Sequence, residues 1–199
     1  MTRLGWSILA LILLAVAGFA SLLSFDGAER TRRAVAAREE APPVDAAPAP
    51  APGELVVPVA GYPRAALRDH WGDPRDGGAR AHTGIDLMAP AGTPVVAAAP
   101  GRVEKLFLSN AGGTTLYQRS PDRRLAFYYA HLAGYAPGIA EGQRVRAGQT
   151  LGYVGDSGNA GAGNYHLHFG ISRMAQDDRW WQGQAVDPYP LLARGARSR

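Results

Sequence analysis

The chain has 199 residues, no cysteine and a formal net charge of +4 at pH 7. Without cysteine it can form neither a disulfide nor a closed zinc site of the Cys-rich structural kind, so any zinc site must use histidine and carboxylate ligands. Residues 1–53 contain five basic and five acidic residues, so the net charge belongs to the rest of the chain. The basic residues there are scattered and match no nucleic-acid-binding motif, which argues against DNA or RNA as a partner.

The first distinct segment along the chain is apolar. Residues 6–25 carry no charge and follow Arg3. About 20 apolar residues in a helix span the core of a bilayer, so we expect one N-terminal transmembrane helix within residues 1–25. A cleaved signal peptide is the alternative, because residues 15–17 and 18–20 both offer small-x-small cleavage sites. The apolar run continues beyond both sites, which favours a retained anchor.

Residues 26–53 predict a linker. They begin with a charged stretch and end in a run of alanine and proline, which stays extended and does not pack into a core. Residues 54–192 are long enough for one domain with a single core. The remaining residues, 193–199, contain three arginines and predict a basic tail.

The domain is expected to be mostly β. The chain has 25 Gly and 15 Pro, and short runs of branched and aromatic residues lie between them. The runs expected to form strands cover residues 95–97, 102–107, 114–117, 125–129 and 151–154. No long stretch after residue 53 has a helical period. We therefore expect an antiparallel β sandwich or partly open barrel, with a functional groove on one sheet.

Three short strings contain the residues that are suited to chemistry. His82 and Asp86 share HTGIDL, His131 lies in YYAHL, and His166 and His168 share HLHF. A catalytic zinc site has three nitrogen or oxygen ligands and an open fourth position. Each string alone is a weak signal, because a single histidine in such a setting is more often a buried core residue. Their joint occurrence in one domain predicts a hydrolytic histidine–carboxylate metal site.

Strand geometry predicts how these side chains are presented. Residues two apart on a strand point to one face, so His166 and His168 should face the groove while Leu167 faces the core. This spacing lets one imidazole bind a metal while the other lies beside it, and the residues alone leave open which is which. Glycine and proline near HTGIDL argue against a helix, so we expect a turn at residues 83–84 that leads into a strand from Ile85.

The order HTGIDL, AHL, GDSGN and HLHF resembles the lysostaphin-type or LytM-type zinc endopeptidases of bacterial cell walls, which have the duplicated hybrid motif fold. The similarity runs from about residue 56 to residue 189 and includes the phrases APAGTPVVAAAPGRV and EGQRVRAGQTLGYVGDSGN. The resemblance implies one zinc ion per chain, bound by His82, Asp86 and His168. It also implies that His131 and His166 are the catalytic histidines beside the metal.

The resemblance implies a zinc metalloendopeptidase that hydrolyses peptide bonds, chiefly crosslinks, of bacterial peptidoglycan during cell-wall remodelling. The alternative is a non-catalytic wall-binding regulator that activates another wall hydrolase, which the five matched residues disfavour. Since the wall lies outside the cytoplasm, the domain is expected in the periplasm, anchored to the inner membrane by the N-terminal segment. After signal cleavage it would instead be a secreted periplasmic protein. The sequence predicts no particular regulatory protein partner.

Three further features are given supporting roles. His70 and Arg75 lie in RDHWGDPR; we expect His70 to be structural or at the surface, and Arg75 to pack or to line the groove. The string GDSGNAGAGN lacks the lysine of a phosphate-binding loop, so we expect it to form a wall of the substrate groove. Gly170 follows HLHF where the related family often has Glu, and this departure leaves substrate detail open.

Overall fold

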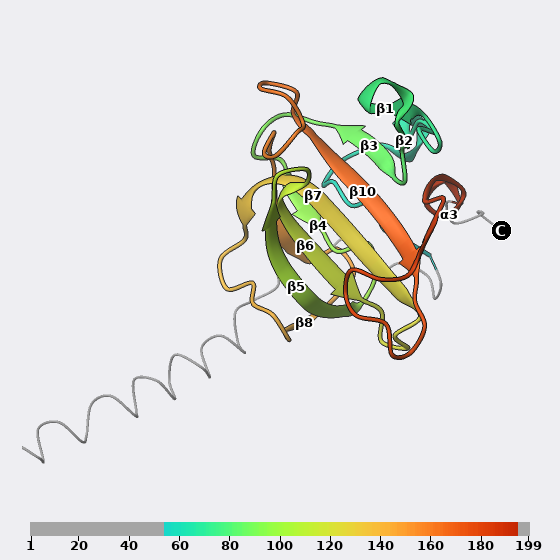
Figure 1. Cartoon of the computed structure of the whole chain (residues 1–199). Helices are drawn as coiled ribbons and strands as arrows, with labels where there is room; N and C mark the ends of the chain where they lie inside the picture. Colours follow the sequence, from blue (N-terminus) through green and yellow to red (C-terminus); the bar gives the residue numbers. More distant parts are fainter. Residues whose placement is uncertain (1–53, 195–199) are drawn as a thin grey trace, which may run out of the picture. The chain divides into compact units, whose positions relative to one another are not determined.

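The computed structural model describes residues 54–194; the expected anchor and linker lie outside these residues, as does most of the expected basic tail. Among the described residues, no helix is both long enough and apolar enough to cross a membrane. A nine-stranded antiparallel sheet forms the body of the domain (Figure 1). The expectation of a mostly β, antiparallel domain is therefore confirmed.

The strands predicted from sequence are present. The large sheet contains β3 (Ile85–Met88), β4 (Pro94–Val96), β5 (Gly101–Ser109), β6 (Gly113–Arg119), β7 (Leu125–Tyr135), β8 (Arg144–Val145), β9 (Thr150–Val154), β10 (His166–Arg173) and β11 (Gln184–Val186). A separate two-stranded sheet contains β1 (Pro74–Arg75) and β2 (Arg80–Ala81). The helical elements are short: η1 (Arg64–Ala66), η2 (Asp76–Gly78) and α3 (Tyr189–Ala193). Each predicted run lies within one of these strands, except that Ala97 follows β4.

Strand β10 lies between β3 and β7, and this pairing positions the site (Figure 1). His168 of β10 is opposite Asp86 of β3 on one side and Ala130 of β7 on the other. Two residues that are 82 positions apart in the sequence are thus held next to each other. The alternation along β10 is the predicted one: Leu167 and Phe169 are fully buried, whereas His166 and His168 line the groove.

The core face of the sheet contains a buried chain of hydrogen bonds. The backbone N–H of Ala98 donates to the hydroxyl of Tyr129 at 2.9 Å, and this hydroxyl donates to Oε1 of Gln118 at 2.7 Å. The amide Nε2 of Gln118 in turn donates to the carbonyl oxygen of Ala99 at 2.6 Å. Tyr129 and Gln118 are fully buried, so these hydrogen bonds offset the loss of contact with water.

Strand β7 departs from regular alternation at His131. Thr114 of β6 pairs with Leu132, and Leu116 pairs with Tyr129, so β7 has one more residue than β6 over this step. Such an extra residue is a β-bulge, which bends a strand and turns a side chain to a new direction. His131 has a positive φ of 60°. In a regular strand it would share the core face with Tyr129, but the bulge turns it to the groove.

Candidate active site

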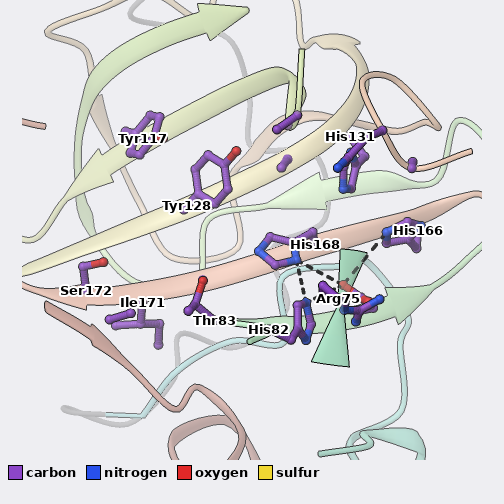
Figure 2. Close-up of a pocket in the computed structure, with 18 of the residues that line it drawn as sticks. Arg75, His82, Thr83, Tyr117, Tyr128, His131, His166, His168, Ile171 and Ser172 are labelled. Carbon is purple, nitrogen blue, oxygen red and sulfur yellow. Dashed lines mark hydrogen bonds and ion pairs between the residues drawn. The ribbon is translucent and has the colours of Figure 1, made fainter. Parts of the chain in front are cut away.

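Three metal-binding atoms converge in the groove, and we call His82, Asp86 and His168 the ligand triangle (Figure 2). The distance is 2.9 Å between His82 Nε2 and His168 Nδ1, 3.1 Å between His168 Nδ1 and Asp86 Oδ1, and 3.2 Å between His82 Nε2 and Asp86 Oδ1. Ligands placed about 2.0–2.1 Å from a tetrahedral zinc ion lie roughly 3.3–3.4 Å apart. The triangle therefore has the size that zinc requires, to within a few tenths of an ångström.

Hydrogen bonds alone cannot satisfy the ligand triangle. Nδ1 of His82 lies 2.8 Å from the carbonyl oxygen of His70, which can only accept, so Nδ1 carries the proton and the neutral ring presents a bare Nε2. Oδ1 of Asp86 is also an acceptor, which leaves His168 Nδ1 as the one possible donor of the three. One proton cannot pair three mutually close acceptors, whereas a divalent cation can. The residues present therefore fit a bound metal.

The charge states of the triangle also suit a cation. Burial raises the pKa of Asp86, but its contacts with His168 and His82 lower that pKa by more, so it falls well below the usual range. Burial lowers the pKa of His168. An ionised carboxylate and neutral imidazoles are the forms in which these residues bind metals.

Two residues of the string RDHWGDPR hold members of the ligand triangle in place through hydrogen bonds. Nη2 of Arg75 donates to Oδ2 of Asp86 at 2.6 Å, so one carboxylate oxygen is fixed while the other is left for the metal. Arg75 also lines the groove, as expected. His70 has the expected structural role: its carbonyl orients His82, and its Nδ1 lies 3.4 Å from the backbone N–H of Asp86. Contacts of this kind hold metal ligands in the correct tautomer and orientation.

His131 and His166 lie side by side next to the triangle, with ring centroids 4.8 Å apart (Figure 2). Nδ1 of His131 donates to the carbonyl of Ser157, and Nδ1 of His166 donates to the carbonyl of Asn164, each at 2.8 Å. Each neutral ring therefore presents a bare Nε2 that can accept a proton. Burial lowers the pKa of His131 to about 4, which keeps this ring neutral at pH 7.

The geometry separates the two histidines of HLHF, which the sequence alone left open. His168 belongs to the triangle, whereas Nε2 of His166 lies 3.9 Å from Asp86 Oδ1. All five residues predicted for the site are thus brought into one groove, His168 as a candidate ligand and His166 beside it. The glycine-rich string also contributes as expected, since Asn159, Ala160 and Asn164 line the groove.

The whole groove has a volume of about 510 Å³. Its far end was not predicted from the sequence. Beyond His168 it is lined by Tyr128, Tyr117, Trp180 and Trp181. The paired tryptophans in the string DRWWQG, in the loop between β10 and β11, were the available signal. Aromatic side chains that line a concave groove are typical of ligand-binding sites.

Comparison with known proteins decides the family. Residues 80–188, more than half of the chain and containing all five site residues, match peptidase family M23. The chain belongs to peptidase family M23. The resemblance to lysostaphin-type and LytM-type enzymes is thereby confirmed, and Arg75 and His70 lie just before the matched region of this M23 domain.

Named relatives and a solved structure share the M23 domain. The L-Ala--D-Glu endopeptidase of Bacillus subtilis is 37% identical over 146 residues, which cover 70% of this chain and 43% of that protein. The peptidoglycan DD-endopeptidase ShyC of Vibrio cholerae is 33% identical over 106 residues, which cover 53% of this chain and 24% of that protein. The chain thus spans less than half the length of either relative. The catalytic domain of lysostaphin from Staphylococcus simulans has a TM-score of 0.53 at 28% identity, covering 65% of this chain and 94% of that domain.

Proposed function

We propose that this chain is a zinc-dependent endopeptidase that hydrolyses peptide bonds of bacterial peptidoglycan. The observation that carries the proposal is the ligand triangle, in which three acceptor atoms lie within 3.2 Å of one another beside two further histidines. Membership of a peptidase family supports the reaction. The names of the two relatives, an L-Ala--D-Glu endopeptidase and a peptidoglycan DD-endopeptidase, support the substrate class. The two names specify different bonds, and we propose a crosslink as the bond that this chain cleaves.

The residues beside the triangle are suited to proton transfer. A zinc ion held by two neutral imidazoles and one carboxylate would supply positive charge that lowers the pKa of water and polarises the scissile carbonyl. His131 or His166 accepts the proton of the attacking water at Nε2, and the ring that has accepted it later donates this proton to the leaving amine. The carbonyls of Ser157 and Asn164 hold the Nδ1 protons, so neither ring needs to change tautomer before it accepts.

One experiment tests the reaction and the metal together. The full chain is purified, its zinc content is measured by elemental analysis, and its activity on isolated cell-wall sacculi is followed by mass spectrometry of the released fragments. We expect about one zinc per chain, loss of release on chelation and recovery with added zinc. The fragment masses identify the bond that is cut. Full hydrolysis by metal-free protein, or none by zinc-loaded protein, would contradict the proposal.

We also propose that the domain works in the periplasm, anchored to the inner membrane by residues 1–25. The uncharged run of residues 6–25 supports this placement. Cell fractionation followed by N-terminal sequencing tests it. A membrane-bound protein with an intact N-terminus is expected, and a soluble periplasmic form that begins near residue 18 or 21 would show instead that the segment is a signal peptide.

A further inference from the structure

Five side chains form a continuous aromatic surface at the end of the groove away from His131 and His166. We call it the aromatic wall; its members are Phe107, Tyr117, Tyr128, Trp180 and Trp181. Neighbouring ring centroids lie 4.7 Å apart for Tyr117 and Tyr128, 4.8 Å for Tyr117 and Trp180, 5.0 Å for Phe107 and Trp180, and 5.2 Å for Trp180 and Trp181. None of these side chains is needed for proton transfer or metal binding.

The aromatic wall is continuous with the reactive centre. The ring of Tyr128 lies 5.8 Å from that of His168, and four wall residues line the same groove as the ligand triangle. Figure 2 shows Tyr128 and Tyr117 on one side of His168, with His166 on the other. The ring-to-ring steps from His168 along the wall to Trp181 are 4.7–5.8 Å each. An extended chain advances about 3.3–3.6 Å per residue, so about six residues at most would lead from His168 to Trp181. A polymer held at the reactive centre therefore reaches the wall.

Charge divides the groove into two ends. Arg75, Arg80 and Asp86 are its charged lining residues among those described, and all three come from the elements around the ligand triangle, β1 to β3. The residues that line the groove beside the aromatic wall are uncharged: Ala126, Ile171, Ser172, Gln182 and Ala185. The guanidinium of Arg179 lies against the Trp181 ring but does not line the groove. Carboxylates of a peptide therefore suit the triangle end. The wall suits an uncharged group that has an apolar face and a polar rim.

Trp181 is the wall residue that is most available to such a group. Its side chain is 55% exposed, and the guanidinium of Arg179 lies 5.3 Å from the ring centroid. One contact with Trp180 and one with Arg179 hold the indole in place while leaving much of it open. Ser172 and Gln182 nearby carry hydrogen-bonding groups. Sugar rings match this surface, because their C–H faces are apolar and their hydroxyl and acetamido groups lie at the rim.

We propose that the aromatic wall is a saccharide subsite that stacks on an N-acetylated sugar of the glycan strand whose peptide is being cleaved. The inference rests on the proposed function, since sugar and peptide are parts of one polymer. It follows that the enzyme binds a peptide attached to its glycan more tightly than the same peptide alone.

Hydrolysis of two matched substrates tests the preference: a soluble muropeptide with its disaccharide and the same peptide without it. The wild type should show a lower KM for the disaccharide-linked substrate. Trp181→Ala should raise that KM about three- to tenfold at unchanged kcat and leave the free peptide unaffected. Trp181→Phe should retain most of the preference. Leu108→Ala is the matched control, because Leu108 is 74% exposed and does not line the groove.

A binding measurement separates the subsite from the reaction. A soluble oligomer of N-acetylglucosamine is titrated into the zinc-loaded full chain, and binding is followed by calorimetry and by tryptophan fluorescence. Binding that Trp181→Ala abolishes and Leu108→Ala preserves supports the subsite even if no muropeptide is cleaved, a result that would sink only the proposed function. Equal effects of Trp181→Ala on both substrates, or oligosaccharide binding that is absent or independent of Trp181, overturn the subsite.

Discussion

Two polar clusters lie on opposite faces of the sheet and are completed in different ways. On the core face, the polar side-chain atoms of Tyr129 and Gln118 each have a hydrogen-bond partner, so the folded chain completes that cluster by itself. On the groove face, the ligand triangle brings three acceptor atoms together with at most one proton between them. Buried polar groups normally have partners, so the surplus acceptors of the ligand triangle point to a bound cation, whereas the core cluster has no such surplus.

The largest effect is expected from His168→Ala, which removes one corner of the ligand triangle. Zinc content should fall from about one per chain to near zero, and wall hydrolysis should fall about 10³-fold or more. The core network should be untouched, so urea unfolding in the presence of chelator should resemble that of the wild type. Elemental analysis and fragment release measure the two losses. A variant that retains zinc at wild-type affinity would show that the triangle is not the metal site.

Substitution of either histidine beside the triangle should reduce the rate of hydrolysis but leave zinc binding intact. His131→Gln and His166→Gln should keep about one zinc per chain while kcat falls about 10²–10⁴-fold, because each removes a proton carrier and no ligand. Zinc analysis and single-turnover assays on the same preparations provide the measurement. If both variants hydrolysed the wall at near-normal rates, the proton-transfer roles would be wrong.

His131 should also make the free energy of unfolding depend on pH. Burial lowers its pKa from 6.5 to about 4, so the unfolded chain binds more protons than the folded chain between these two values. This contribution to stability is complete above pH 6.5 and is lost as pH falls through about 4. It amounts to about 3 kcal/mol for a shift of this size.

Urea unfolding of zinc-free protein at several pH values measures this contribution. His131→Gln should lose less stability than the wild type between pH 6.5 and 4. Parallel stability curves for the two proteins would refute the assignment to His131.

The smallest effect is expected on the core face. Tyr129→Phe leaves the N–H of Ala98 and Oε1 of Gln118 without their partner, which should cost about 1–2 kcal/mol of unfolding free energy. Zinc content and kcat should stay at wild-type values, because the hydroxyl faces away from the groove. Chemical denaturation measures the loss of stability, and zinc analysis and the wall assay measure the two values that should not change. A large loss of zinc in this variant would contradict the view that the core cluster is independent of the metal site.

Short-range patterns in the sequence predicted the features that depend on neighbouring residues, such as the face of a strand to which a side chain points. The period of two along HLHF was enough to place His166 and His168 on the groove face. The ligand role of His168 depends instead on the register of β3, which brings Asp86 opposite it. Register joins segments that are far apart in the chain, so no local pattern contains it.

Other parts of the site depend on pairing that the sequence does not display. Alternation from Tyr129 predicts a core-facing His131, and only the extra residue against β6 reverses that direction. The aromatic wall is assembled across strands, since Trp180 in the β10–β11 loop meets Tyr117 of β6. Strands β5, β6 and β7 are consecutive and pair with their neighbours along the chain, whereas the places of β10 beside β7 and of β8 beside β5 depend on pairing between distant segments.

The bulge in β7 also decides which groups surround the metal position. Ala130 is the residue directly opposite His168, and it places only a methyl group there. His131 follows one place further along the strand, where the extra residue and the positive φ turn its imidazole to the groove. In a regular strand the imidazole would point into the core, and the space in front of Ala130 would lack this histidine beside it. One inserted residue therefore places the proton carrier next to the space that a water molecule and a peptide carbonyl share, while Ala130 leaves that space open.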